Sequence, residues 1–195
     1  MILALTGGIG SGKTIVSKVF ETMGCVVYNS DEKAKELYSN FEVKQKVVEL
    51  FGSKAYREDG KLDTQFVSHI IFNNKIQMER LNEIIHPVLK NDFESFVKNQ
   101  KPETIVIKES ALIFETHLNL NFKNIILVTA PLDQKIKRVM LRNSISKIDI
   151  EKRMNAQWSD EKKIPLANFI ISNGLEDAII PQALKILNTL KKQIS

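Results

Sequence analysis

Five short apolar runs are spaced along the chain, and each is too short to form a helix. They are rich in β-branched residues and are bounded by Gly, Asn, Asp or Pro. Such runs are typical of strands that are buried on both faces of a parallel sheet. The predicted strands are Ile2–Leu5, Val26–Tyr28, Thr104–Ile107, Asn124–Val128 and Phe169–Ile171.

Helical periodicity appears between and after these runs. Apolar residues recur every three or four positions in Thr14–Met23, in Asp133–Arg142 and in the C-terminal stretch that includes Ile180, Leu184 and Leu187. Strands that alternate with helices predict an α/β fold, with right-handed crossovers placing helices on both faces of a five-stranded parallel sheet. We therefore expect three layers.

The interval between the second and third predicted strands departs from this alternation, because its pattern is helical throughout. Leu81, Ile85 and Val88 belong to an apolar stripe that is interrupted at Pro87. A proline within a helical pattern predicts a kink or break, here near Ile85–His86. We expect a helical insertion in a single domain.

The segment Gly7–Thr14 reads GGIGSGKT and matches the phosphate-binding loop pattern G-x-x-x-x-G-K-[ST]. It directly follows a predicted strand and precedes an amphipathic helix, which is the context the motif requires. Glycines let successive N–H groups approach phosphate oxygens, and the helix N-terminus favours the same anion. Lys13 is expected to reach the β- and γ-phosphates, and the Thr14 hydroxyl to ligate Mg²⁺. The motif predicts a site for ATP with Mg²⁺.

Carboxylates follow two of the predicted strands, at the sheet edge where parallel strands bind ligands. Asp31 is placed either to align an acceptor hydroxyl or to stabilise the start of the next helix. Glu109 ends the third strand, where a carboxylate often acts on Mg²⁺ indirectly, and Glu115 follows six residues later. The alternative for Glu109 and Glu115 is an ordinary solvated acid.

Arg138 and Arg142 lie four residues apart, so both project from one face of a predicted helix. Phosphoryl transfer spreads negative charge over oxygens that arginines stabilise. Surface salt bridges are the alternative. The charged segment 143–163 that follows is interpreted as a lid, or otherwise as a surface helical hairpin.

The composition excludes several classes of protein. The 195 residues carry a formal charge of +5, and Cys25 is the only cysteine, within an apolar run that predicts a buried, inert thiol. No intrachain disulfide or zinc cluster is expected, and no run of about 18 apolar residues predicts a membrane span. We expect a cytoplasmic protein that binds neither membrane nor nucleic acid.

Three rival functions remain at this point. A kinase for nucleoside monophosphates would share the same core and differ in the insertion. A GTPase normally has N-K-x-D, but Asn74–Gln77 lacks the acid. A nucleic-acid-dependent ATPase would cluster basic and aromatic residues, whereas aromatics make up 7% of this chain and the basic residues are dispersed.

Several further motifs follow one another along the chain: after the phosphate loop come Leu81–Pro87 (L-x-x-I-x-H-P), Ala111–Glu115 (P-L-L-F-E), the helix with Gln134, Arg138 and Arg142, Arg153–Gln157, and Ala167–Gly174. This ordered set resembles the dephospho-coenzyme A kinase family nearly end to end. Asn29, Ala111 and Asn168 depart from the family pattern, in which two acids and a proline are usual.

The resemblance implies a P-loop kinase that transfers the γ-phosphoryl group of ATP to the 3′-hydroxyl of dephospho-CoA, as a monomer or weak homo-oligomer. It implies a nucleotide core (about 1–30, 101–142 and 164–195), a helical CoA-binding insertion (about 31–100) and a lid (about 143–163). The implied catalytic residues are Lys13, Asp31, Arg138 and Arg142. The implied ATP-binding residues are Gly8, Gly10, Ser11, Gly12, Lys13, Thr14, Ile15 and Asn173. The implied acceptor-binding residues are Asp31, His86, Pro87, Leu112 and Glu115. The implied Mg²⁺ ligand is the Thr14 hydroxyl, and Glu109 is implied to act on the ion indirectly.

Overall fold

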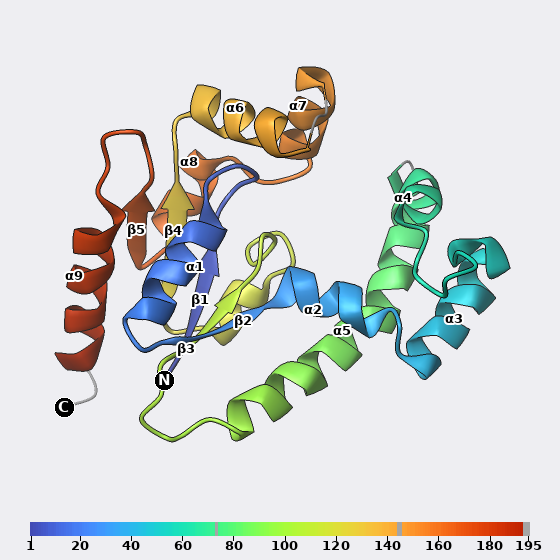
Figure 1. Cartoon of the computed structure of the whole chain (residues 1–195), viewed down its shortest axis with the longest axis horizontal. Coiled ribbons are helices and arrows are strands. Elements are labelled where there is room, and N and C mark those ends of the chain that lie inside the picture. The colour runs from blue at the N-terminus through green and yellow to red at the C-terminus, as the bar shows by residue number, and fades with distance from the viewer. Residues whose placement is uncertain (73, 144–145, 193–195) are drawn as a thin grey trace. The chain divides into compact units, whose positions relative to one another are not determined.

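The structure is a computed structural model that describes residues 1–72, 74–143 and 146–192. Within these residues, five parallel strands form one sheet in the order β2-β3-β1-β4-β5 (Figure 1). This confirms the predicted α/β fold with a five-stranded parallel sheet. The strands are β1 (Ile2–Thr6), β2 (Val26–Asn29), β3 (Val106–Glu109), β4 (Ile125–Thr129) and β5 (Phe169–Ser172).

The chain divides into two compact units, of which the first combines Met1–Asn29 with Lys101–Ser195 and the second is Ser30–Gln100. Besides the sheet, the first unit contains α1 (Lys13–Thr22), η2 (Leu118–Asn121), α6 (Leu132–Asn143), α7 (Lys147–Asn155), α8 (Asp160–Lys163), η3 (Ile164–Leu166) and α9 (Ile179–Lys192). The second contains α2 (Ser30–Leu37), α3 (Phe41–Phe51), η1 (Ser53–Ala55), α4 (Thr64–Phe72) and α5 (Lys75–Lys98).

The two faces of the central strand β1 pack into different clusters. Leu3 and Leu5 are fully buried among apolar residues of α1 and α9. Ala4, on the opposite face, packs with Phe114 and Leu127. Because successive side chains of a strand point to opposite faces, this alternation shows that the sheet is covered on both sides. On the Ala4 side the cover includes a turn-rich segment that carries Phe114.

The strand β3 aligns the end of the sheet on which the phosphate loop begins. Its last residue, Glu109, stands opposite Leu5 of β1 and Asn29 of β2. The strand begins at Val106, two residues later than predicted. The reason is that the Thr104 N–H donates to the Lys101 carbonyl at 2.9 Å, which forms a turn before the strand. β2 and β3 therefore end level with one another, and β1 runs one residue further.

The second unit is a helical cluster, as predicted, apart from one isolated β-bridge. Leu81 and Ile85 of α5 pack with Val43 and Val47 of α3 in its core. The helix α5 continues through Pro87, so of the predicted kink or break only the kink occurs. Figure 1 shows that its axis bends between its two halves, as expected where a proline removes one backbone hydrogen bond.

The burial of Cys25 confirms the prediction of an inert thiol. Its side chain lies in the main core cluster, and burial raises the thiol pKa to about 11. It therefore stays protonated at neutral pH. No helix among the described residues combines the length and apolar character that crossing a membrane requires.

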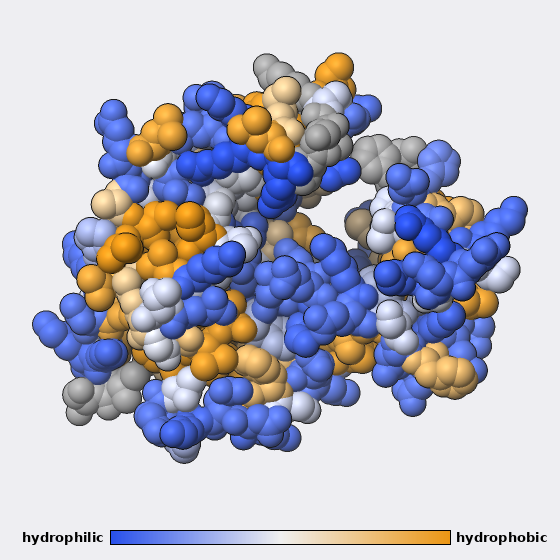
Figure 2. All heavy atoms as spheres, viewed as in Figure 1, coloured by the Kyte–Doolittle hydropathy of each residue, from blue (hydrophilic) through white to orange (hydrophobic). Residues whose placement is uncertain are grey.

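The surface of the first unit is not uniformly polar. In Figure 2, apolar residues gather over the part of this unit around α1 and β5. Each of these elements exposes an apolar side chain, Ile15 in α1 and Ile170 in β5. β5 pairs with β4 alone in the described sheet, and an edge strand has fewer neighbours to cover its side chains.

Candidate active site

The phosphate loop joins β1 to α1 at the carboxyl end of the sheet, as predicted. The Ser11 N–H donates to the Gly8 carbonyl at 3.1 Å, which turns the loop tightly. Lys13, the first residue of α1, folds back so that its Nζ donates to the Gly7 carbonyl at 3.0 Å. The loop, the helix N-terminus and an ammonium group thus share one small region, as phosphate binding requires.

Two glycines of the loop permit close packing by other elements. Gly10 and Gly12 have φ values of 78° and 91°, in the left-handed region that favours glycine. A Cβ on Gly10 would lie 2.4 Å from the carbonyl oxygen of Lys135, and one on Gly12 would lie 2.0 Å from Nδ2 of Asn173. The backbone of α6 and the loop after β5 therefore press directly on the phosphate loop.

Replacing Gly10 with alanine should destabilise the protein by about 1–3 kcal/mol more than replacing Gly24, because overpacking adds to the cost of a left-handed backbone. Gly24 is a matched control, since its φ is 87° but a Cβ there would meet nothing within 4 Å. The free energies of unfolding, from denaturant titration, provide the comparison. Equal losses for the two variants would contradict the close contact with α6.

Arg138, predicted as a catalytic residue, and Asn173, predicted to bind ATP, both lie against the phosphate loop. Asn173 is buried, and its Nδ2 donates to the Ser11 carbonyl at 2.8 Å. The Arg138 guanidinium donates to the Asn173 carbonyl at 2.7 Å, and its other nitrogen is 3.5 Å from the carbonyl oxygens of Gly10 and Ser11. Arg142, one turn further along α6, is exposed.

Glu109 is only 4% exposed, so the solvated-acid alternative is wrong for this residue. Its Oε2 accepts a hydrogen bond of 2.6 Å from the Ser17 hydroxyl. Ser17 lies three residues after Thr14 on α1 and shares its helix face, which places the buried carboxylate behind the Thr14 position. Thr14 itself is exposed, as is the predicted ATP-site residue Ile15.

These residues fit a magnesium ion held largely by nucleotide phosphates. Among the described residues, no cluster of three or more His, Cys, Asp or Glu side chains forms a metal cage. Mg²⁺ needs no such cage, because one or two protein ligands, phosphate oxygens and water complete its shell. The exposed Thr14 hydroxyl in front of the buried Glu109 carboxylate is a donor set of that kind.

Glu115 is also not a solvated acid, because it makes two contacts with the predicted lid segment. Its Oε1 accepts from the Trp158 N–H at 2.8 Å and lies 2.8 Å from Nζ of the fully buried Lys163. A buried charge is stable only when it is paired, so Glu115 and Lys163 hold each other in place. Leu112, one turn before Glu115, is 41% exposed.

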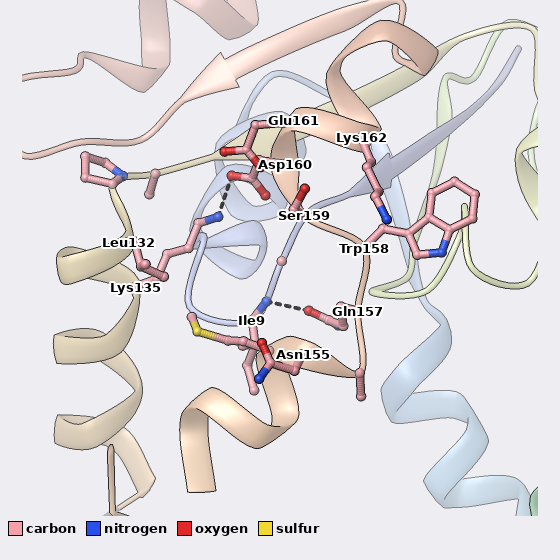
Figure 3. Close-up of a pocket in the computed structure, with 15 residues that line it drawn as sticks. Ile9, Leu132, Lys135, Asn155, Gln157, Trp158, Ser159, Asp160, Glu161 and Lys162 are labelled. Carbon is pink, nitrogen blue, oxygen red and sulfur yellow. Dashed lines mark hydrogen bonds and ion pairs between the residues drawn. The ribbon is translucent and has the colours of Figure 1, made fainter. Parts of the chain in front are cut away.

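The segment 146–163 forms α7 and α8 and lines a pocket of about 660 Å³ with the phosphate loop (Figure 3). Gln157 accepts a hydrogen bond of 2.9 Å from the Ile9 N–H, and Asp160 is ion-paired with Lys135 of α6. Residues 144 and 145, near the start of the predicted lid, lie outside the described residues. No sequence pattern assigned a role to Lys135 or Asp160, because these residues stand 25 positions apart and match no motif.

The predicted acceptor residues of the second unit lie on two of its helices. Asp31 is exposed in the first turn of α2. His86 and Pro87 are exposed on α5, at the middle of that helix. They line an open hollow of about 460 Å³ together with Glu79, Asn82 and Glu83.

Comparison with known proteins agrees with this geometry. The dephospho-CoA kinase family model matches residues 1–177. The chain is 33% identical over 193 residues to the dephospho-CoA kinase of Bacteroides fragilis, a match covering 98% of this chain and 94% of that protein. The crystal structure of TT1252 from Thermus thermophilus superposes with a TM-score of 0.88 at 26% identity over 97% of each chain. Dephospho-CoA kinase from Campylobacter jejuni shares the fold, with a TM-score of 0.71 at 23% identity over 100% of this chain and 98% of that one. The phosphate loop with its assembled partners and the match along nearly the whole sequence show that this chain belongs to the dephospho-CoA kinase family.

Proposed function

We propose that this chain transfers the γ-phosphoryl group of ATP to the ribose 3′-hydroxyl of dephospho-CoA and releases coenzyme A and ADP. The observation that carries the proposal is the phosphate loop, on which Lys13, Arg138 and Asn173 converge within one unit of a chain of this family. A cytoplasmic location and a monomeric or weakly oligomeric state belong to the same proposal.

The nucleotide phosphates are held by the loop itself. Backbone N–H groups of the loop bind the phosphate oxygens, and Lys13 exchanges its bond to the Gly7 carbonyl for the β- and γ-phosphates. Asn173 and Ile15 border the rest of the nucleotide. Because α6 and the loop after β5 pack closely on the loop backbone, little backbone reorganisation is needed when charge develops on the transferring group.

Magnesium, when bound, neutralises charge on the β- and γ-phosphates. Thr14 is the side chain that ligates it, and Glu109 acts from behind through its hydrogen-bonded neighbour Ser17. The buried carboxylate thereby fixes the polar face of α1 on which Thr14 stands.

The second unit supplies acceptor-binding residues. Asp31 accepts a hydrogen bond from the 3′-hydroxyl and aligns it, and His86 and Pro87 on α5 also bind the substrate. In the first unit, Leu112 and Glu115 are further acceptor-binding residues, and Glu115 also contacts Trp158 and Lys163. Arg138 and Arg142 stabilise the charge on the transferring group, so most of the acceleration comes from positioning and electrostatics.

The function is tested by ADP release in the presence of dephospho-CoA, AMP, UMP or no acceptor, each with Mg²⁺ and with the metal chelated. We expect turnover with dephospho-CoA and Mg²⁺ alone, with coenzyme A identified by mass. Turnover only with a monophosphate would overturn the acceptor assignment and leave the ATP site standing. Undiminished turnover with chelated metal would remove Mg²⁺ from the mechanism.

A further inference from the structure

A second lysine besides Lys13 stands at the mouth of the phosphate loop. Lys135 belongs to the first turns of α6 and is only 7% exposed, although lysine is among the residues that are rarely buried. Figure 3 shows its ammonium group directed toward Asp160, with which it forms an ion pair. Neither residue has a role in the mechanism described above.

The ion pair lies where a phosphate group would approach the loop. A Cβ built on Gly8 would stand 3.5 Å from Nζ of Lys135 and 3.5 Å from Oδ1 of Asp160. On the other side, Lys13 donates to the carbonyl of Gly7, the preceding residue. The ammonium groups of Lys135 and Lys13 therefore lie near Gly8 and Gly7, two consecutive residues at the start of the loop. Lys13 is the residue of this motif that binds the β- and γ-phosphates.

Protein acceptors from the segment 157–160 occupy this region. Asp160 forms an ion pair with the ammonium group of Lys135, and the Gln157 side chain accepts a hydrogen bond from the Ile9 N–H. The charge of Lys135 also affects Glu161. The pKa of Glu161 lies below its ordinary value, chiefly through hydrogen bonds from the Ser159 hydroxyl and the backbone, with Lys135 contributing.

A bound triphosphate competes strongly for such a lysine. It brings several negative charges against the single charge of Asp160, and because both bonds are charge-assisted, the larger charge favours the phosphate. Lys135 cannot simply move away, because its own backbone carbonyl lies against Gly10 of the loop. Its side chain needs to turn only from the Asp160 carboxylate toward the loop.

We propose that Lys135 is a second phosphate-binding residue, which Asp160 holds in place at the loop until ATP arrives and which then binds the terminal phosphate. Asp160 is a positioning residue in this scheme. The inference rests on the proposed function in that it takes ATP as the polyphosphate ligand, but it requires no statement about the acceptor.

The test is calorimetric titration of the full chain with ATP, ADP and AMP in the presence of Mg²⁺. Lys135→Met keeps the length of the side chain and should weaken ATP binding about tenfold or more, ADP binding less, and AMP binding not at all. Asp160→Asn frees Lys135 from its partner and should leave ATP binding unchanged or tighter. Lys137→Met, at an exposed position of the same helix, is the matched control and should bind like the wild type.

The different ATP affinities expected for the two variants distinguish phosphate binding by Lys135 from an ion pair that only closes the lid. Equal shifts in ATP affinity for Lys135→Met and Asp160→Asn would mean that the pair only closes the lid, and wild-type affinity for Lys135→Met would overturn the proposal outright. If Lys135→Met unfolds, Lys135→Arg provides the test and should keep the preference for ATP over ADP, whose loss would refute the proposal. Failure of the wild type to bind ATP would instead count against the proposed function.

Discussion

Replacing Lys13 with alanine is expected to lower kcat at least about a thousandfold while leaving the fold intact. The lysine supplies a full positive charge to the β- and γ-phosphates, and removing even one neutral donor from a preorganised anion site typically costs about a hundredfold to a thousandfold in kcat. Its ammonium group donates to the Gly7 carbonyl, and the loss of such a hydrogen bond should lower the unfolding free energy by about 1 kcal/mol. Steady-state kinetics and thermal unfolding measure the two effects.

The matched control is Lys18→Ala, at an exposed position of the same helix α1. It removes one positive charge from the same unit and should keep kcat within about twofold of the wild type, because exposed charges contribute little. If Lys18→Ala and Lys13→Ala lost activity to a similar extent, general loss of positive charge would explain both results. A Lys13→Ala protein with substantial turnover would refute the phosphate-binding role.

Replacing Asp31 with asparagine should lower kcat by about a hundredfold or more, with ATP binding unchanged. The asparagine side chain keeps the size of the aspartate but cannot take a proton from the hydroxyl, and general base catalysis contributes about a hundredfold to ten-thousandfold. Because Asp31 stands outside the phosphate loop in the sequence, the KM for ATP should not change. Initial rates at saturating ATP and varied dephospho-CoA measure the effect.

Asp31 also lies in the first turn of α2, where an acid stabilises a helix by a few tenths of a kcal/mol, roughly 0.3–1. Glu42→Gln removes a comparable first-turn acid from α3 of the same unit and controls for that effect. The control should lose a similar amount of stability and keep its activity. An unchanged kcat for Asp31→Asn would leave Asp31 with only the helix-stabilising role that its position also suggests.

The fold and the phosphate site were predictable because their signals are local. A buried parallel strand is a short run of β-branched residues, as at Val26–Tyr28, and a phosphate loop needs its glycines and lysine in consecutive positions. The strand, loop and helix at Gly7–Thr14 are therefore set by neighbouring residues, and the structure has them where the sequence predicted. The length of α5 was less predictable, because contacts of Leu81 and Ile85 keep the helix continuous past Pro87.

The charged contacts around the site depend on tertiary structure. Glu109 meets Ser17 across 92 positions, and Glu115 meets the Trp158 N–H across 43. The sequence placed Glu109 at the end of a predicted buried strand but left open whether either acid was solvated, because the end of a strand can face water. Whether a carboxylate anchors a helix, holds a lid segment or faces water is decided by which distant element packs on it. The sequence by itself determined the nucleotide chemistry, and the tertiary structure alone determined which charges support it.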